Sequence, residues 1–304
     1  MDVAERRVST LEAAAHAELA TQEPRRRRPR NLLARILFVV LLLGCSLVFM
    51  APFAWLVSAS LKLRSEVFNF EWIPDPVQWV NYVKVWQAAP LFAWLKNSLF
   101  VGAVGGVAVT LSSSLVAFGF AYFRFRGRDT LFALVLATMM LPQMVTLIPV
   151  YLIWNKLGFI NTLVPLWAGN LFGSAFYIFL LRQFYLTLPR DLFNAARIDG
   201  ANYFQLWLRV AFPLTRTAMI VVFIFEFKAL WTDLMKPLIY LFDNTLFTMP
   251  RGIKTLVDRF GQGGEMQWEI VLASTVILTV PLIILFFLGQ RYFIEGISAT
   301  GVKE

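Results

Sequence analysis

Residues 188–214 read LPRDLFNAARIDGANYFQLWLRVAFPL, and this polar segment separates two long apolar stretches. Pro189 suits the first turn of a helix, where its missing N–H is not needed. Gly200 can adopt the left-handed conformation that closes a helix. We therefore predict a two-turn helix that ends at Gly200. A second helical segment, Tyr203–Phe212, is expected to break at Pro213 before the next apolar stretch.

One face of the two-turn helix, called the low face here, carries mostly short side chains. Leu192, Ala195, Ala196 and Asp199 recur at three- and four-residue steps, so they share that face. The alanines allow another surface to approach closely. Because a two-turn helix is marginal by itself, we expect it to pack against the ends of its own bundle or against a soluble partner.

The composition is that of a membrane protein. Apolar residues make up 58% of the 304 residues and charged residues 15%, against about 45–50% and about 25% in soluble domains. The formal net charge is +9. However, the basic residues lie between apolar runs, as topology signals do, and are not interleaved with aromatic residues on a polar surface. This pattern argues against nucleic-acid binding.

Six stretches are long and apolar enough to cross a bilayer. A hydrocarbon core about 30 Å thick takes roughly 20 residues of helix, and helices are expected because lipid offers backbone amides no other partner. The predicted spans are Ile36–Ser60, Ser98–Phe123, Leu131–Trp154, Leu163–Leu181, Ala218–Leu241 and Ile270–Leu288. The predicted fold class is an all-α membrane protein. Pro142 and Pro149 are expected to kink the third span.

The basic residues predict the orientation. Eighteen of the 28 Lys and Arg residues lie in the N-terminal tail, the second-to-third and fourth-to-fifth connections, and the C-terminus. Because cytoplasmic segments are enriched in Lys and Arg, we predict that both termini are cytoplasmic. The domain prediction is a basic tail at 1–35 and a transmembrane domain at 36–304, with an extracytoplasmic loop at 61–97 and a cytoplasmic loop at 188–214.

Two of these segments keep two interpretations each. The tail is either solvated chain that holds the first helix in place or a binder of anionic lipid headgroups. The Trp and Pro residues of the outer loop indicate anchors at the membrane interface or a contact surface for an external partner. They are Trp72, Pro74, Pro76, Trp79, Trp86 and Trp94.

The chain lacks the residues of common catalytic sites. Cys45 is the only cysteine and His16 the only histidine, which argues against a disulfide, a Cys or His metal site and a Ser–His or Cys–His arrangement. No Gly-x-x-x-x-Gly-Lys-Ser/Thr sequence occurs, so we expect ATP hydrolysis to need a partner. The protein is expected to act by moving and not by catalysing.

The segment 188–214 is similar to the EAA loop of binding-protein-dependent ABC importer permeases. That loop reads Glu-Ala-Ala, three residues, Gly, nine residues, Ile, any residue, Leu-Pro. Here Asn194-Ala195-Ala196, Gly200 and Val210-Ala211-Phe212-Pro213 match every spacing. Further motifs over residues 36–304 resemble the carbohydrate branch, of the maltose G-permease type. They are Trp72-Ile73-Pro74 with Asn81-Tyr82, Phe123-Arg124-Phe125-Arg126-Gly127-Arg128, Leu180-Leu181-Arg182-Gln183-Phe184, Leu141-Pro142 with Ile148-Pro149, and Gln290-Arg291-Tyr292-Phe293 with Gly301-Val302-Lys303.

The resemblance implies a type-1 ABC importer permease fold in a bacterial plasma (inner) membrane. It implies half of a translocation path for a sugar, and no cofactor on this chain. The implied partners are a second homologous permease, two ATPase subunits that carry ATP and Mg, an extracytoplasmic binding protein, and membrane lipid.

The resemblance also implies which residues couple to the ATPase. They are Asn194, Ala195, Ala196, Arg197, Asp199, Gly200, Arg209 and Pro213. Asn194 replaces the family's Glu, which is held to pair with a basic residue of the ATPase. Asn keeps a hydrogen-bond acceptor and loses the charge, and charge-assisted hydrogen bonds are about twice as strong as neutral ones.

The fifth predicted span carries Glu226, Lys228, Asp233 and Lys236. A charge at the bilayer centre costs about 2.5–3.5 kcal/mol on insertion scales, so such residues face a polar interior or reach toward the interface. Asp233 and Lys236 are three residues apart and are expected to pair on one helix face.

Part of this set is expected to line a polar path. An aromatic face such as that of Trp231 is suited to stacking on a sugar ring. Two asparagines near span ends are weaker candidates, and we expect them to satisfy local backbone groups. The candidate path residues are Trp231, Asp233, Lys228, Asn97 and Asn170.

Three other functions remain alternatives. A permease for a non-sugar solute would have the same features. An intramembrane enzyme would need clustered carboxylates or histidine at an interface, and the acids here are scattered. A secondary transporter is expected to be longer and to show internal repeats.

Overall fold

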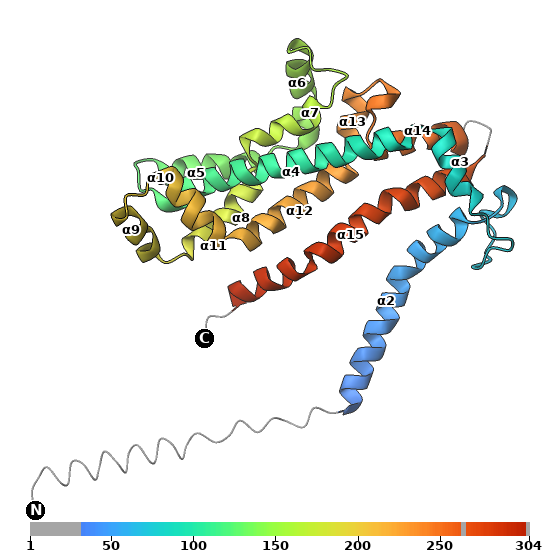
Figure 1. Ribbon diagram of the computed structural model, residues 1–304, viewed down its shortest axis with the longest axis horizontal. Coiled ribbons are helices and arrows are strands. Elements are labelled where there is room, and N and C mark those ends of the chain that lie inside the picture. Colours follow the sequence, from blue (N-terminus) through green and yellow to red (C-terminus); the bar gives the residue numbers. More distant parts are fainter. Residues whose placement is uncertain (1–31, 263–265, 302–304) are drawn as a thin grey trace, which may run out of the picture. The chain divides into compact units, whose positions relative to one another are not determined.

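The computed structural model describes residues 32–262 and 266–301, and the chain divides into two compact units, residues 1–55 and 56–304. All regular structure in the described residues is helical (Figure 1). The predicted basic tail, 1–35, lies outside the described residues except for its last four, and so does the end of the chain from residue 302.

Most of α2 (Leu32–Ser60) forms the first unit, and it contains the predicted first span. The second unit holds the remaining helices. Its longer helices are α3 (Val80–Ala88), α4 (Leu91–Tyr122), α5 (Arg128–Ala137), α6 (Gln143–Lys156), α8 (Ala175–Leu186), α9 (Arg190–Ile198), α12 (Arg216–Thr232), α14 (Met249–Leu256) and α15 (Trp268–Gly301). Its short segments are η1 (Arg64–Glu66), η2 (Thr138–Met140), α7 (Val164–Trp167), η3 (Ala168–Phe172), α10 (Tyr203–Gln205), η4 (Leu206–Ala211), α11 (Phe212–Leu214), α13 (Met235–Tyr240), η5 (Asn244–Leu246) and η6 (Val257–Gln262).

Four helical segments of the described chain are long and apolar enough to cross a membrane, and up to six if each of two bent pairs counts as one span. One of the four, Val164–Leu186, is itself composed of α7, η3 and α8. One bent pair, residues 128–156, corresponds to the predicted third span. The other joins Tyr203–Leu214, in the predicted cytoplasmic loop, to Arg216–Thr232, which covers the first part of the predicted fifth span. The prediction of six spans therefore holds only if each bent pair crosses the membrane once.

The third span is broken where we expected a kink. The α5–η2 segment and α6 meet at 98°. A proline disfavours the helical conformation of the residue before it, and Leu141 before Pro142 is extended, with ψ 118°. Pro142 then precedes α6, whereas Pro149 lies inside that helix.

The fifth span ends earlier than predicted. α12 stops at Thr232, and α13 begins separately at Met235. Asp233 is extended, and its carboxylate accepts a hydrogen bond from the Lys236 N–H at 3.2 Å. Aspartate competes with a continuous helix through such local bonds, and Pro237 has no N–H to donate back to the Asp233 carbonyl.

Two apolar clusters hold the second unit together. α4 packs along α8 and α12, and α15 packs on α12. One cluster, which includes Trp94 and Leu241, joins α3, α4, α14 and α15. The other, which includes Phe118 and Leu181, joins α4, α8, α9 and η4. Figure 1 shows α9–α11 at one end of the unit and α3 and α14 at the other.

The connection at 61–97 is folded chain and includes α3. The amide of Asn81, which is buried, donates to the carbonyls of Ser60 and Lys62 at 3.0 and 2.9 Å. Trp94 is 1% exposed, and its indole N–H donates to Asn244 O at 2.7 Å. The expectation that Trp94 anchors at the interface is therefore wrong, whereas Trp72, Trp79 and Trp86 are exposed.

Candidate functional site

The predicted two-turn helix is α9, and its end has the predicted geometry. Gly200 has φ +85°, a conformation that glycine adopts without a side-chain clash. The Gly200 N–H bonds to Arg197 O, and the Ala201 N–H to Ala196 O, both at 3.0 Å. This pair of bonds is the Schellman motif, which satisfies carbonyls left open at a helix end.

Phe193 anchors α9 to the end of the membrane bundle. It is 5% exposed, and its ring centroid lies 6.0 Å from that of Phe118 and 5.4 Å from that of Tyr122, both in α4. The predicted low face is turned away: Leu192 and Ala195 are exposed. Of the two expected packing partners of this helix, the protein's own bundle is confirmed through Phe193 and the half-buried Ala196, and Leu192 and Ala195 stay open to a further partner.

A second helical segment begins after α9, as predicted. Asn202 and Gln205 form a capping box, with each side chain bonding the other's backbone N–H at 2.9 Å. The segment continues through the π-helical η4 to α11 and meets α12 at 83°. The predicted break next to Pro213 is confirmed, with the bend at Thr215.

A buried hydrogen-bond chain joins this segment to the bundle. The Trp207 indole N–H in η4 donates to Ser114 Oγ in α4 at 2.9 Å, and Ser114 Oγ lies 2.7 Å from the Tyr185 hydroxyl in α8. None of these three residues was predicted from the sequence. The run Ser112–Ser114 inside an apolar helix was the available signal, since a buried hydroxyl needs a hydrogen-bond partner.

The predicted coupling residues lie together at this end of the unit. Asn194 and Arg197 line a hollow of about 250 Å³ beside α9, together with Arg124 and Arg190. The guanidinium of Arg197 lies 5.7 Å from the ring centroid of Tyr203. Arg209, Pro213 and Asp199 are exposed but line no part of this hollow. The position of the missing Glu is thus surrounded by positive charge.

A second candidate site is a cleft of about 530 Å³ between α6, α12 and α13. Its polar lining comes from Gln143, Thr146, Glu226, Asp233 and Lys236. Its apolar lining includes Met144, Leu147, Leu230 and Tyr240. Polar groups set among apolar and aromatic walls are typical of sites that bind small organic solutes.

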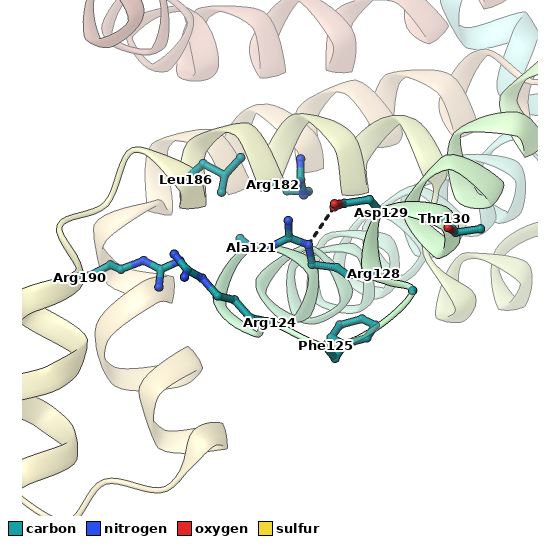
Figure 2. A pocket seen from close by; sticks show the side chains of 10 residues that line it. Ala121, Arg124, Phe125, Arg128, Asp129, Thr130, Arg182, Leu186 and Arg190 are labelled. Carbon is teal, nitrogen blue, oxygen red and sulfur yellow. Dashed lines mark hydrogen bonds and ion pairs between the residues drawn. The ribbon is translucent and has the colours of Figure 1, made fainter.

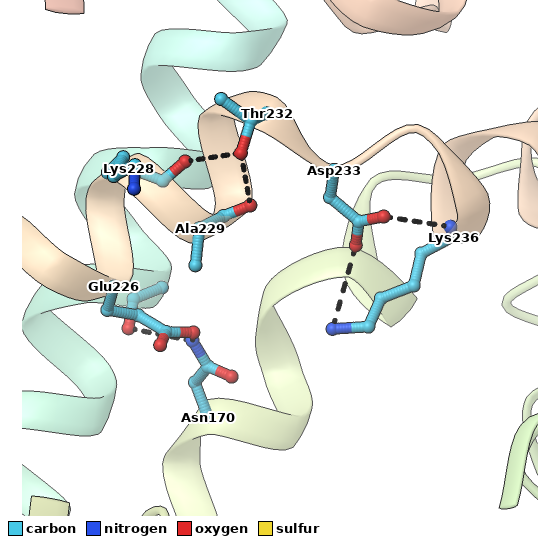
Figure 3. Close-up of polar contacts among 8 residues, drawn as sticks. Asn170, Glu226, Lys228, Ala229, Thr232, Asp233 and Lys236 are labelled. Carbon is cyan, nitrogen blue, oxygen red and sulfur yellow. Dashed lines mark hydrogen bonds and ion pairs between the residues drawn. The ribbon is translucent and has the colours of Figure 1, made fainter. Parts of the chain in front are cut away.

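Glu226 lies well inside α12 and has a specific partner (Figure 3). Its carboxylate accepts a hydrogen bond from the Asn170 amide in η3 at 2.7 Å, and that amide also donates to Gly105 O at 3.1 Å. A Cβ on Gly105 would lie 2.4 Å from a Leu230 side-chain atom. A larger residue at 105 would therefore require the Leu230 side chain to move and would crowd the Asn170 amide. The prediction that Asn170 satisfies a backbone group is confirmed, and its bond to Glu226 is new.

Asp233 and Lys236 pair as predicted, but not on a continuous helix. Lys236 Nζ lies 3.8 Å from Asp233 Oδ2 across the turn between α12 and α13 (Figure 3). The lysine side chain is 42% exposed, so this ion pair is weak. Both charged groups can therefore bind a solute in the cleft.

Trp231 and Lys228 are not in the cleft. Trp231 is 0% exposed, its indole N–H donates to Leu278 O at 3.1 Å, and its ring stacks on Phe227. Because the ring has no free face, the predicted stacking on a sugar does not fit this structure. Lys228 is exposed on another side of α12 and does not line the cleft.

Asn97 has a structural contact at the α3–α14 end. Its amide donates to Thr245 O and Phe247 O at 2.9 and 3.0 Å, so the expectation that it satisfies backbone groups is confirmed. The same turn is held by Asp243. Hydrogen bonds from the N–H and the hydroxyl of Thr245 to this carboxylate lower the pKa of Asp243.

These two sites have the features of a transporter with moving helices. Among the described residues, no three His, Cys, Asp or Glu side chains are grouped as a metal site requires. One site is a projecting helix tied to the bundle by Phe193 and Trp207. The other is a polar cleft between broken helices, and helix breaks at membrane depth are tolerated where they are buried in protein or line an aqueous cavity.

Comparisons with known proteins agree with this description. The family described as "Binding-protein-dependent transport system inner membrane component" matches residues 109–298. The chain is 30% identical over 283 residues to the arabinooligosaccharides transport system permease protein AraQ of Bacillus subtilis (strain 168), covering 91% of this chain and 99% of that protein. It is 31% identical over 267 residues to the sn-glycerol-3-phosphate transport system permease protein UgpE of Yersinia enterocolitica, covering 85% and 94%.

Two solved structures share the fold. A chain of a bacterial ABC transporter involved in the import of the acidic polysaccharide alginate superposes with a TM-score of 0.75 at 22% identity, over 89% of this chain and all of that one. A chain of a bacterial alginate ABC transporter in complex with an alginate pentasaccharide-bound periplasmic protein gives 0.58 at 15% identity, over 87% and 96%.

Proposed function

The chain belongs to the family of binding-protein-dependent transport system inner membrane components, and from this premise we propose that it is a permease subunit of an ATP-driven sugar importer. It forms half of a translocation path and catalyses no reaction itself. The observation that carries the proposal is α9, a helix anchored by one inward side chain, with its low face exposed.

The proposed topology places α9 in the cytoplasm. Arg124, Arg190 and Arg197 gather around α9, and cytoplasmic ends of membrane proteins are enriched in Lys and Arg. Both termini are then cytoplasmic, with the basic tail at 1–35 preceding the transmembrane domain at 36–304. The loop at 61–97 and the α13–α14 connection face outward.

The proposed partners follow from this arrangement. ATPase subunits bind on the exposed face of α9 and carry the ATP and Mg. A second, homologous permease completes the path. An extracytoplasmic binding protein delivers the solute to the outward loops, as the periplasmic protein named with one alginate transporter structure illustrates.

Movement passes from α9 into the bundle through two contacts. Phe193 bears on α4, and Trp207 is hydrogen-bonded through Ser114 to Tyr185. When ATP closes the ATPase pair, a displacement of α9 therefore shifts α4 and α8 together. The bundle alternates between two states, and each partner biases the equilibrium toward the state it binds better.

The charge of the cleft favours a neutral solute. Glu226 and Asp233 against Lys236 leave a formal charge of −1 on its lining. An anionic solute would be repelled in this low-dielectric setting, whereas sugar hydroxyls can donate to the carboxylates. A neutral oligosaccharide fits better than a phosphate ester such as the solute named for UgpE, which is the second candidate.

The test of the coupling role compares two matched glycines. In Gly200→Pro the ring forces φ to about −65° where the chain needs +85°, and the N–H bond to Arg197 O is lost. Gly158 has φ +76°, open space around it and an equivalent N–H bond to Asn155 O at 3.0 Å. It follows α6, away from α9.

The assay uses the tagged full chain purified from its native membranes. The native chain should co-purify with ATPase activity, and cells should take up sugar only when ATP is available. Gly200→Pro should insert normally and lose both properties, whereas Gly158→Pro should keep the ATPase. Normal uptake by Gly200→Pro would contradict the proposed function.

A further inference from the structure

Four arginines line one hollow beside the end of α4. The hollow has a volume of about 550 Å³ and is bordered by the α4–α5 turn, α8 and the start of α9 (Figure 2). Its arginines are Arg124, Arg128, Arg182 and Arg190. Asp129 is the one acid among its described lining residues, which leaves a formal charge of +3.

Most of this charge is not neutralised within the described chain. Arg128 is paired with Asp129 at 2.9 Å. Arg124, Arg182 and Arg190 have no ion pair among the described residues. The guanidinium of Arg182 is held 4.3 Å above the ring of Phe132, and its Nε atom is buried without a hydrogen-bond partner. Buried polar groups of this kind are rarely left unsatisfied, so the Arg182 Nε–H is a donor available to an anion.

We propose that this hollow binds the phosphate group of an anionic phospholipid. The planar guanidinium fork matches phosphate oxygens, and several arginines can share one phosphate. Basic pockets between membrane helices on the cytoplasmic side are suited to such headgroups. The proposal goes beyond transport and would hold for any solute.

The position of the hollow favours a lipid over a partner protein. Arg182 lies one turn before the end of the candidate span Val164–Leu186, and long basic side chains near span ends extend toward the membrane interface. Phe125 and Leu186 border the hollow and are 45% and 48% exposed, so acyl carbons have an apolar surface beside the charge. Arg124 and Arg190 also border the hollow beside α9, whereas Arg128 and Arg182 border this hollow alone.

The experiment measures lipid retention by the full-length chain in uncharged detergent, using native mass spectrometry. The probes are dioctanoyl phosphatidylglycerol, dioctanoyl phosphatidylcholine and inorganic phosphate at equal concentrations. The variants are Arg182→Gln and Arg124→Gln. The matched control is Arg216→Gln, because Arg216 is exposed at the start of α12 and borders no part of the hollow.

Phosphatidylglycerol should be retained more strongly than phosphatidylcholine. Each hollow variant should weaken phosphatidylglycerol binding about fivefold, because one basic residue near an anionic lipid surface contributes about 1 kcal/mol. The control should leave this binding unchanged. If Arg182→Gln fails to fold, Arg124→Gln carries the test, because Arg124 is exposed.

Three results would overturn the proposal. One is equal retention of the two lipids. Another is unchanged phosphatidylglycerol binding by both hollow variants, even if they lose association with the ATPase, which would make the hollow a protein contact. The third is equally tight binding of inorganic phosphate at the same arginines, which would assign the site to a free anion.

Discussion

Replacing Phe193 by alanine should release α9 without unfolding the membrane bundle. Phe193 is 5% exposed and contacts Phe118 and Tyr122, and truncation of a buried Phe to Ala typically costs about 3–5 kcal/mol. A helix of two turns has almost no stability by itself. Since α9 gains its order from this contact, the loss should appear locally.

The magnitude can be read from proteolysis. When local opening is fast, cleavage follows the population of the open form, and every 1.4 kcal/mol changes a population about tenfold. A cost of about 3 kcal/mol therefore predicts more than a hundredfold faster trypsin cleavage after Arg197, which lies within α9. Fragments of the full chain in detergent are quantified by mass spectrometry.

Leu192→Ala is the matched control. Leu192 is the neighbouring residue of the same helix and is 45% exposed, so its truncation should cost about 1 kcal/mol and change cleavage less than tenfold. It should instead weaken ATPase association, because it lies on the outward face. Similar cleavage of Phe193→Ala and the native chain would refute the view that this ring holds α9.

Two further substitutions test the remaining contacts. Trp207→Phe removes the donor to Ser114 and should lower the free energy of unfolding by about 1 kcal/mol; thermal denaturation of Trp207→Phe, Ser114→Ala and the double variant should show that the two effects are not additive, and full additivity would argue against the bond. Glu226→Gln keeps an acceptor for Asn170 and removes a negative charge from the cleft, so uptake of an anionic sugar relative to a neutral one should rise severalfold; an unchanged ratio would mean that this charge does not select the solute.

Rules about single residues were sufficient to predict where helices end or break. Gly200 and Pro213 were predicted to end and break helices, and the structure places both features there. The first, second, fourth and sixth predicted spans also overlap the four long apolar helical segments. These predictions succeed because proline and glycine constrain their own backbone whatever surrounds them.

Features that depend on the tertiary neighbourhood were missed. Pro142 breaks its span by 98°, whereas the local argument predicted a kink without its size. Trp231 is buried although its neighbours suggested a path. Apolar residues are spread around α4 and α12 without helical periodicity, so the hydrophobic pattern could not indicate which face packs inward. The charge of Glu226 within a span indicated a polar surrounding, but the sequence could not identify Asn170 as its partner.

The way α9 is attached has a consequence for how such permeases diversify. Its inward side packs on the bundle through Phe193 and Ala196. Its outward side, with Leu192 and Ala195, is exposed. If an ATPase binds this outward side as proposed, mutations there are selected through that contact and not through the membrane domain, so the ATPase partner can change while the transport path stays intact. Grafting the outward residues of α9 from a relative would change the ATPase partner and leave the transported solute the same.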